Sequence, residues 1–142
     1  MTAIAAKSHD FAPIKTFGDY RVSLWSLSGE IIAGEPATLQ YKISRNNVEV
    51  TDLEPYLGAA MHLAIVKDDL RQFVHTHGEV HGSGQPQPMN VQSHLHPAPP
   101  PKFGPSVEAH MVFPEAGTYY IFGEFKHQGR VITASFAVEV FD

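Results

Sequence analysis

Hydrophobic and polar residues alternate along much of this chain. From Ala37 to Ser44, apolar residues occupy every odd position and polar residues every even one, and a similar alternation begins at Tyr20. Successive side chains of a β-strand point to opposite faces, so this period of two indicates strands with one buried and one wet face. No stretch shows a helical period that is worth naming. The pattern therefore predicts an all-β protein.

The C-terminal third of the chain predicts an antiparallel meander. Three apolar runs, at 107–113, 118–125 and 130–141, are separated by the turn sequences Pro114–Gly117 and Lys126–Gly129. Short strands at this spacing, with turn residues between them, are typical of a β-sandwich. Together with the N-terminal strands they predict an antiparallel β-sandwich of about seven or eight strands.

The length of 142 residues predicts a single domain. We expect a flexible N-terminal arm at 1–17 and one β-sandwich domain at 18–142. Within that domain, the segment 78–105 contains seven prolines and four glycines. Proline cannot donate a hydrogen bond to a sheet, so this segment is expected to be a long, Pro/His-rich surface loop.

The stretch 61–77 predicts a β-hairpin. Two apolar runs flank the polar sequence Lys67–Asp69, as strands flank a short turn. A loop of either two or four residues places His62 opposite His75. His77 lies two residues further along, so it shares the face of His75. The hairpin thus brings three histidines to one face.

This register depends on the length of the loop. A three-residue loop would instead place Val74 opposite His62. In the predicted register the Cβ atoms of directly opposed residues lie about 4.5–5.5 Å apart, which allows two imidazoles to share one metal ion. The alternative interpretation is structural, with histidines that cap one end of the sandwich through hydrogen bonds to the backbone.

The amino-acid composition excludes several kinds of cofactor and partner. The chain has no cysteine, which excludes disulfides, thiolate zinc sites, iron–sulfur clusters and cysteine-ligated blue copper. Its formal charge of −5 disfavours nucleic acid as a partner, and no apolar run is long enough to span a membrane. Nine histidines against ten lysines and arginines stand out. Metal binding is the chemistry that this composition favours.

Several other residues are candidates for additional ligands. His110 is the natural fourth ligand if its strand packs near the hairpin, with Glu108 on the same face as an acceptor for a ring N–H. The secondary candidates are Met61, Met111, Met89, His81, His94 and His96. The two methionines next to His62 and His110 point to the opposite face and are more typical of a core. His127 lies at a turn and is expected to be solvated.

Several pieces of the sequence carry a family resemblance. They are Tyr56–Ala59, His62 at the start of an apolar strand, Asp69-Leu70…Phe73–His77, Ala109–Pro114, Gly117–Tyr119 and Phe125…Gly129–Val131. The region they cover resembles the YtkA-like, cupredoxin-like domain of bacterial secreted and membrane-anchored proteins. The resemblance implies a cupredoxin-like or immunoglobulin-like sandwich in the periplasm or elsewhere outside the cytoplasm, and a part in copper or heavy-metal handling. Met61, where the family would have Gly, and the His-rich loop both favour copper.

We therefore expect an extracytoplasmic copper-binding protein with a storage, chaperone or resistance role and no enzymatic activity. The ion is Cu(II) or Cu(I), with zinc as the alternative, and the partner a membrane transporter or a metal-accepting protein. No Gly-x-Ser-x-Gly, phosphate-binding glycine loop or His-Glu-x-x-His motif is present. Two other hypotheses stay open: a metal-free β-sandwich interaction module, and a small His-ligated copper redox enzyme.

Overall fold

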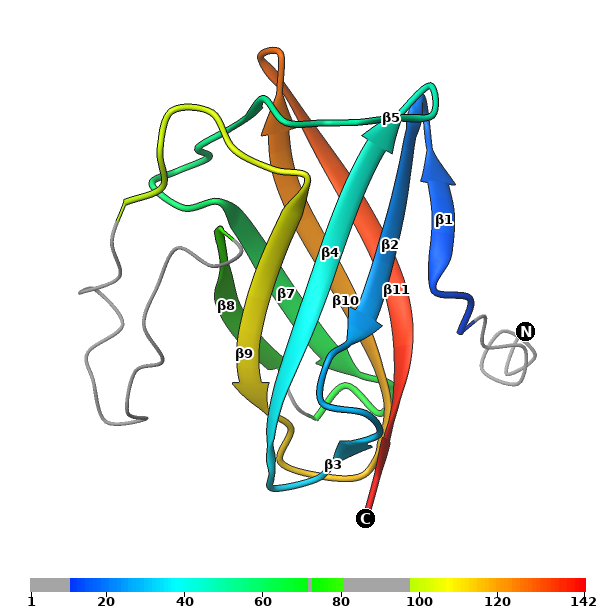
Figure 1. Ribbon diagram of the computed structural model, residues 1–142. Helices are drawn as coiled ribbons and strands as arrows, with labels where there is room; N and C mark the ends of the chain where they lie inside the picture. Colours follow the sequence, from blue (N-terminus) through cyan, green and yellow to red (C-terminus); the bar gives the residue numbers. More distant parts are fainter. Residues whose placement is uncertain (1–10, 72, 81–97) are drawn as a thin grey trace.

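The computed structural model describes residues 11–71, 73–80 and 98–142, which form eleven β-strands and no helix (Figure 1). The all-β prediction is confirmed. The strands are β1 (Ile14–Phe17), β2 (Tyr20–Ser26), β3 (Ile31–Ile32), β4 (Pro36–Arg45), β5 (Val48–Glu49), β6 (Leu53–Glu54), β7 (Met61–Lys67), β8 (Phe73–Val80), β9 (Ser106–Val112), β10 (Gly117–His127) and β11 (Arg130–Phe141).

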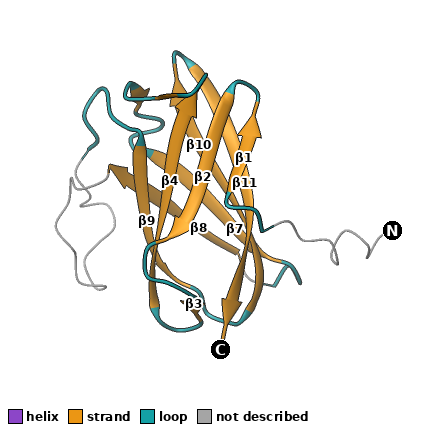
Figure 2. Ribbon diagram, turned by 45° about the vertical axis from the view of Figure 1, so that its right-hand side comes forward, coloured by secondary structure: helices purple, strands orange, loops and turns teal. Residues whose placement is uncertain are grey.

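The strands belong to one curled, mixed sheet with the order β1-β2-β4-β9-β8-β7-β10-β11-β3. Its two halves lie face to face, with β1, β2, β4 and β9 in one layer and β7, β8, β10 and β11 in the other (Figures 1 and 2). The expected antiparallel sandwich of seven or eight strands is wrong in two respects. The strands are more numerous than expected, because three of them have only two residues and are too short to show a period in the sequence. The sheet is also not wholly antiparallel, since β3 pairs with β11 in parallel.

Strand β8 joins the two halves because it pairs with β7 on one side and with β9 on the other. Gly78 permits this close crossing. A Cβ at that position would lie 2.5 Å from Val107 Cγ1 and 3.1 Å from Met61 Cβ. Because Gly78 has no side chain, the histidine-bearing strand β8 can pack closely against β9.

The core lies between the two halves and is filled by alternate residues of their strands. Leu39, Tyr41 and Ile43 of β4 are almost completely buried, as are Leu63 and Ile65 of β7. The alternation in the sequence therefore predicted these buried faces correctly. Because the inward positions of β7 are apolar, its intervening residues, His62 among them, are left on the outer face.

Two segments differ from their expected structure. Residues Ile14–Phe17, expected in the N-terminal arm, form β1 and pair with β2. In the predicted loop 78–105, Gly78–Val80 belong to β8, and Phe103 forms a β-bridge with Leu53. Residues 81–97 of that loop lie outside the described residues.

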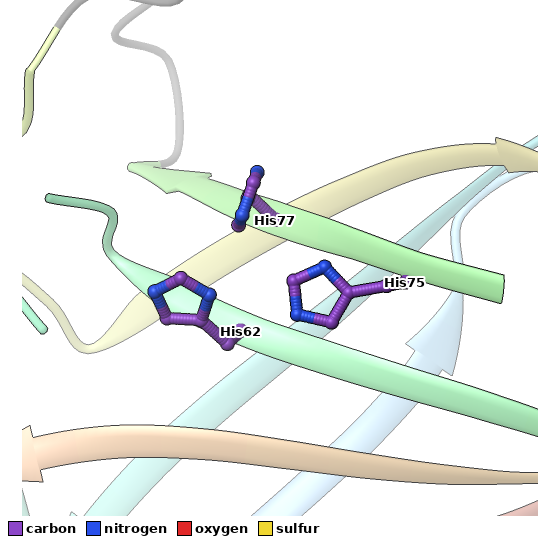
Figure 3. Close-up of side chains that lie close together, drawn as sticks. All are labelled: His62, His75 and His77. Carbon is purple, nitrogen blue, oxygen red and sulfur yellow. The ribbon is translucent and has the colours of Figure 1, made fainter. Parts of the chain in front are cut away.

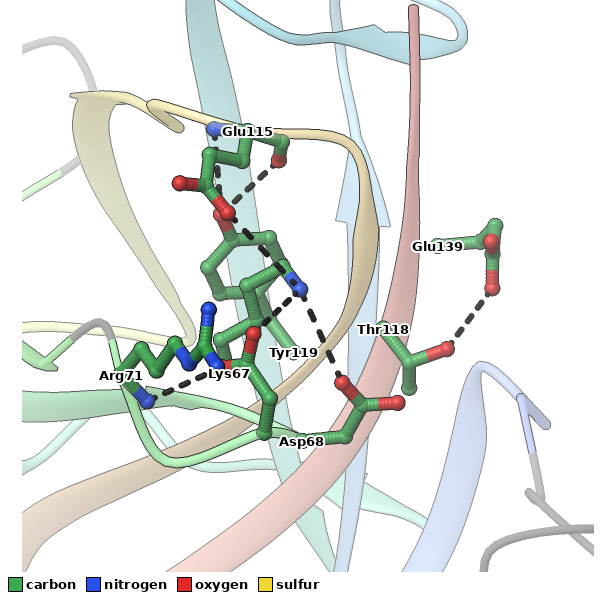
Figure 4. Close-up of polar contacts among 8 residues, drawn as sticks. Lys67, Asp68, Arg71, Glu115, Thr118, Tyr119 and Glu139 are labelled. Atoms are coloured by element: carbon green, nitrogen blue, oxygen red, sulfur yellow. Dashed lines mark hydrogen bonds and ion pairs between the residues drawn. The ribbon is translucent and has the colours of Figure 1, made fainter.

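The β7–β8 turn is longer than the sequence predicted. Leu70 adopts a positive φ of 63°, and its N–H donates to the Lys67 carbonyl at 2.8 Å. Asp69 accepts from the Arg71 N–H at 2.9 Å and from Lys67 Nζ at 3.1 Å. The hydrogen bond to Asp69 raises the pKa of Lys67, whose ammonium also lies 3.9 Å from Glu115 in the β9–β10 turn (Figure 4). These contacts fix the wider turn.

The wider turn moves the register by two residues. His62 lies opposite His77, Ala64 opposite His75 and Val66 opposite Phe73. The prediction that His62 faces His75 is therefore wrong. A shift of two residues leaves every side chain on its original face, so the three histidines still share the outer surface.

Candidate metal centre

His62, His75 and His77 form one cluster on the outer face of β7 and β8 (Figure 3). A ligand nitrogen from each ring lies within 4.8 Å of those from the other two. Ring centroids are 4.7 Å apart for His62 and His77, 5.2 Å for His75 and His77 and 5.6 Å for His62 and His75. Tetrahedral coordination with bonds of 2.0–2.1 Å places ligand nitrogens about 3.3 Å apart, so small side-chain rotations bring the rings into ligating positions.

The ring of His62 is already oriented. Its Nε2 lies 2.8 Å from the carbonyl oxygen of Tyr56, and the Tyr56 ring packs edge-on against it at 5.4 Å. A carbonyl only accepts, so Nε2 carries the proton and Nδ1 keeps its lone pair. In Figure 3 one ring nitrogen of His62 faces His75 while the other points away. Metal-binding histidines commonly have their second nitrogen fixed in this way.

A tight turn presents the Tyr56 carbonyl. Tyr56 and Ala59 exchange two backbone hydrogen bonds of 2.8 and 3.1 Å across Leu57 and Gly58. Both central residues have positive φ, 52° at Leu57 and 82° at Gly58, as in a type I′ turn. Positive φ is costly for a branched residue such as Leu57. The same Tyr56 carbonyl thus accepts from Ala59 and from His62.

The segment before this turn is anchored at several points. Leu53 exchanges backbone hydrogen bonds of 2.8 and 3.2 Å with Phe103, and it pairs with His127 through β6 and β10. Glu54 accepts from Lys102 Nζ and from the Gly129 N–H, both at 3.2 Å. These contacts hold an otherwise irregular connection in place beside β7.

His127 is a further anchor, and its predicted solvation is wrong. The residue is 3% exposed, with Nε2 2.8 Å from Asp52 Oδ1 and Nδ1 2.6 Å from the Tyr20 hydroxyl. The carboxylate accepts from Nε2–H, so Nδ1 accepts from the Tyr20 O–H. The hydrogen bond from His127 lowers the pKa of Asp52. A histidine at a turn gives no sequence signal for this, because its partners lie 75 and 107 residues away.

The other predicted ligands do not join the cluster within the described residues. His110 is exposed on β9, and its Nδ1 lies 3.0 Å from Thr38 Oγ1. Among the described residues, the ligand atoms that lie within 4.8 Å of one another come from His62, His75 and His77, and His110 is not part of that group. Met61 and Met111 are buried in the core, on the opposite face from the histidines. The loop candidates His81, Met89, His94 and His96 lie outside the described residues.

One neighbour of the cluster was missed by sequence reasoning. Glu124 of β10 lies directly opposite His62 and is half-buried. Its outward position follows from the alternation of β10, but its place beside His62 requires the pairing of β10 with β7. Those strands are separated by two others in the chain, and no local pattern encodes that pairing.

The chain belongs to the family described as domain of unknown function DUF8832, which matches residues 15–142. No curated protein matches the sequence. None of the comparisons specifically supports the resemblance to the YtkA-like domain. Within the described residues, no helix is both long and apolar enough to cross a membrane.

Two solved structures resemble the chain at low sequence identity. A DUF4426 family protein from Pseudomonas aeruginosa PAO1 is 13% identical, with 90% of this chain and 96% of that chain covered and a TM-score of 0.51. The PmoD soluble domain from Methylocystis sp. ATCC 49242 (Rockwell) is 16% identical, with 91% and 97% covered and a TM-score of 0.47. The first similarity supports the all-β architecture, whereas the second is too weak to bear on fold or function.

Proposed function

We propose that this protein binds a copper ion through His62, His75 and His77. One observation carries the proposal: three imidazoles converge on one sheet face, with a ligand nitrogen of each within 4.8 Å of the others. Neutral imidazole suits Cu(II) and Zn(II), so zinc is the competing ion. With no cysteine in the chain, a copper complex here has no intense blue colour.

The exposure of the rings supports binding over a structural role. His75 and His77 are exposed and His62 is partly buried. Rings that stabilise a fold by packing lie in its interior, where His127 is found. Exposed rings on an outer face add little packing energy, but they leave room for an ion to enter and leave.

An accessible site of this kind suits a protein that exchanges metal rather than one that turns over a substrate. We place the protein outside the cytoplasm, as the resemblance to YtkA-like, cupredoxin-like domains implies. Its role there would be copper storage, delivery or resistance. The partner would be a membrane transporter or a metal-accepting protein, which would approach the open outer face of β7 and β8.

The proposal is tested on protein purified without a histidine tag. Elemental analysis, calorimetric titration with Cu(II) and Zn(II), and electron paramagnetic resonance (EPR) of the copper complex give the stoichiometry and the ligand type. We expect about one Cu(II) per chain and a nitrogen-rich EPR spectrum. His75→Ala should weaken binding strongly, whereas His110→Ala, which removes an exposed strand histidine outside the cluster, should not.

Absence of saturable copper binding would contradict the proposal and favour a metal-free interaction module. That second candidate has an observation of its own. Phe73, on the same face as His75, is 67% exposed, and Leu70 in the adjacent turn is 79% exposed. An apolar end of the hairpin can contact another protein with or without a metal.

A further inference from the structure

Glu124 occupies the position next to the histidine cluster on the third strand. It lies opposite His62 across β10 and β7, and His62 lies opposite His77 across β7 and β8. Directly opposed residues share a face, with Cβ atoms about 4.5–5.5 Å apart. Glu124, His62 and His77 therefore form one row across three adjacent strands, and His75 lies beside this row.

The carboxylate of Glu124 is not engaged by any other residue that the structure describes. No hydrogen bond or ion pair to it is found within the part of the chain that the structure describes. Other carboxylates around these strands are engaged: Asp69 with Lys67, Glu54 with Lys102 and Glu139 with Thr118. Glu79, which shares the face of His77 on β8, also has a partner. Glu124 is thus half-buried, lies one strand away from His62 and is unengaged among the described residues, so its carboxylate is free to rotate toward an ion bound by His62.

The donor atoms around the cluster are nitrogen and oxygen. The two described methionines, Met61 and Met111, are buried on the opposite face of the sheet, with exposures of 0% and 8%. Cu(I) prefers soft sulfur ligands, whereas a carboxylate is a hard ligand. The attraction of a carboxylate to a divalent ion is also twice that to a monovalent one at equal distance.

We infer that Glu124 is the fourth ligand of the site and makes it selective for a divalent ion, Cu(II) or Zn(II), over Cu(I). This inference rests on the proposed function. His62 contributes Nδ1, since its Nε2–H is held by the Tyr56 carbonyl. The donor set is then three imidazole nitrogens and one carboxylate oxygen, with the ion on the outer face of β7.

The test compares Glu124→Gln with Glu30→Gln. Glu30 is exposed in the β2–β3 connection, so its substitution removes the same charge away from the site. Affinities for Cu(II) and Zn(II) are measured by chelator competition at neutral pH, and affinity for Cu(I) in the same way without oxygen. Glu124→Gln should lower both divalent affinities about 10- to 100-fold and the Cu(I) affinity by a smaller factor. Glu30→Gln should leave all three unchanged.

A second readout is the EPR spectrum of the Cu(II) complex, which should change between native protein and Glu124→Gln as an oxygen ligand is replaced. Equal thermal unfolding midpoints of the two metal-free variants would exclude a folding defect. Unchanged divalent affinities and spectra in Glu124→Gln, with binding still dependent on His62, would overturn the fourth ligand alone. Absence of saturable binding by the native protein would overturn the proposed function as well.

Discussion

His62 and His77 lie directly opposite each other on β7 and β8, with ring centroids 4.7 Å apart and planes at 86°. His75 lies opposite Ala64, whose small side chain leaves room for its ring beside that of His62. The three rings therefore form a triangle rather than a line. An ion bound to any two of them is within reach of the third.

This arrangement predicts strong coupling between His62 and His77. His62→Ala and His77→Ala should each weaken Cu(II) binding strongly, and the double variant should lose little more. Residues that share one partner are non-additive, with coupling on the order of 1–3 kcal/mol. Calorimetric titration of the native protein, both single variants and the double variant gives this energy.

The matching control is the pair His62→Ala and His110→Ala, which should be additive because His110 contacts Thr38 instead of the cluster. Thermal unfolding of the metal-free variants should be nearly unchanged, since the cluster rings lie outside the core. If the losses for His62 and His77 simply add, the two side chains serve different sites.

The faces of the strands were predictable, but their partners were not. The period of two placed Leu63 and Ile65 inward and His62 outward, and the register shift of two residues between the predicted and the observed turn left every side chain on its predicted face. The predicted length of the turn was wrong, because Leu70 adopts a positive φ and the Asp69 carboxylate accepts a hydrogen bond from the Arg71 N–H. No glycine marks that turn in the sequence.

Long-range pairing explains the other differences. His127 contacts Tyr20 and Asp52 only because β10 faces β2 across the core and pairs with β6, which directly follows Asp52. Glu124 lies opposite His62 because β10, which is separated from β7 by two strands in the chain, pairs with β7. Local alternation carries no information about which strands become neighbours. The position of Glu124 opposite His62 could therefore be found only from the structure.

Metal binding should depend on pH. Only neutral imidazole ligates, and histidine in water titrates near pH 6.5. We therefore expect the apparent Cu(II) affinity to fall steadily between about pH 7 and pH 5, with protons released on binding at the lower pH values. Titration in buffers of different ionisation enthalpy measures that release. An affinity independent of pH in this range would point to carboxylate or backbone ligands instead.

Acid stability should depend on Asp52. Its hydrogen bond with His127 lowers its folded-state pKa below the unfolded value, so its contribution is present above that unfolded pKa. The contribution is lost as pH falls through the lower folded-state pKa. The Asp52 side chain is 49% exposed, so the effect should be less than about 1 kcal/mol.

The variant Asp52→Asn keeps an acceptor for His127 and removes the charge. Its free energy of unfolding, measured by urea denaturation, should be lower than that of the native protein at pH 7 and should converge with it near pH 2. Asp142→Asn, at the exposed C-terminal residue, is the control and should follow the native curve. A constant difference between Asp52→Asn and native protein at all pH values would contradict the role of the charge.

The Tyr56–Ala59 turn should control metal affinity through His62, and a matched pair of glycines tests this. Gly58 and Gly29 have nearly equal φ of +82° and +83°, and a Cβ at either would have no atom within 4 Å. Alanine at each position should therefore cost a similar backbone strain of about 1 kcal/mol, seen as similar losses in free energy of unfolding. Gly58 lies in the turn whose Tyr56 carbonyl holds His62 Nε2, whereas Gly29 lies in the β2–β3 connection. Gly58→Ala should thus lower Cu(II) affinity while Gly29→Ala should not.

In the metal-free protein, two-dimensional proton–nitrogen NMR should show His62 as the Nε2–H tautomer, and Gly58→Ala should shift it toward a mixture. Equal metal affinities in the two variants, or an Nδ1–H tautomer at His62 in the native protein, would show that this turn does not orient the ligand.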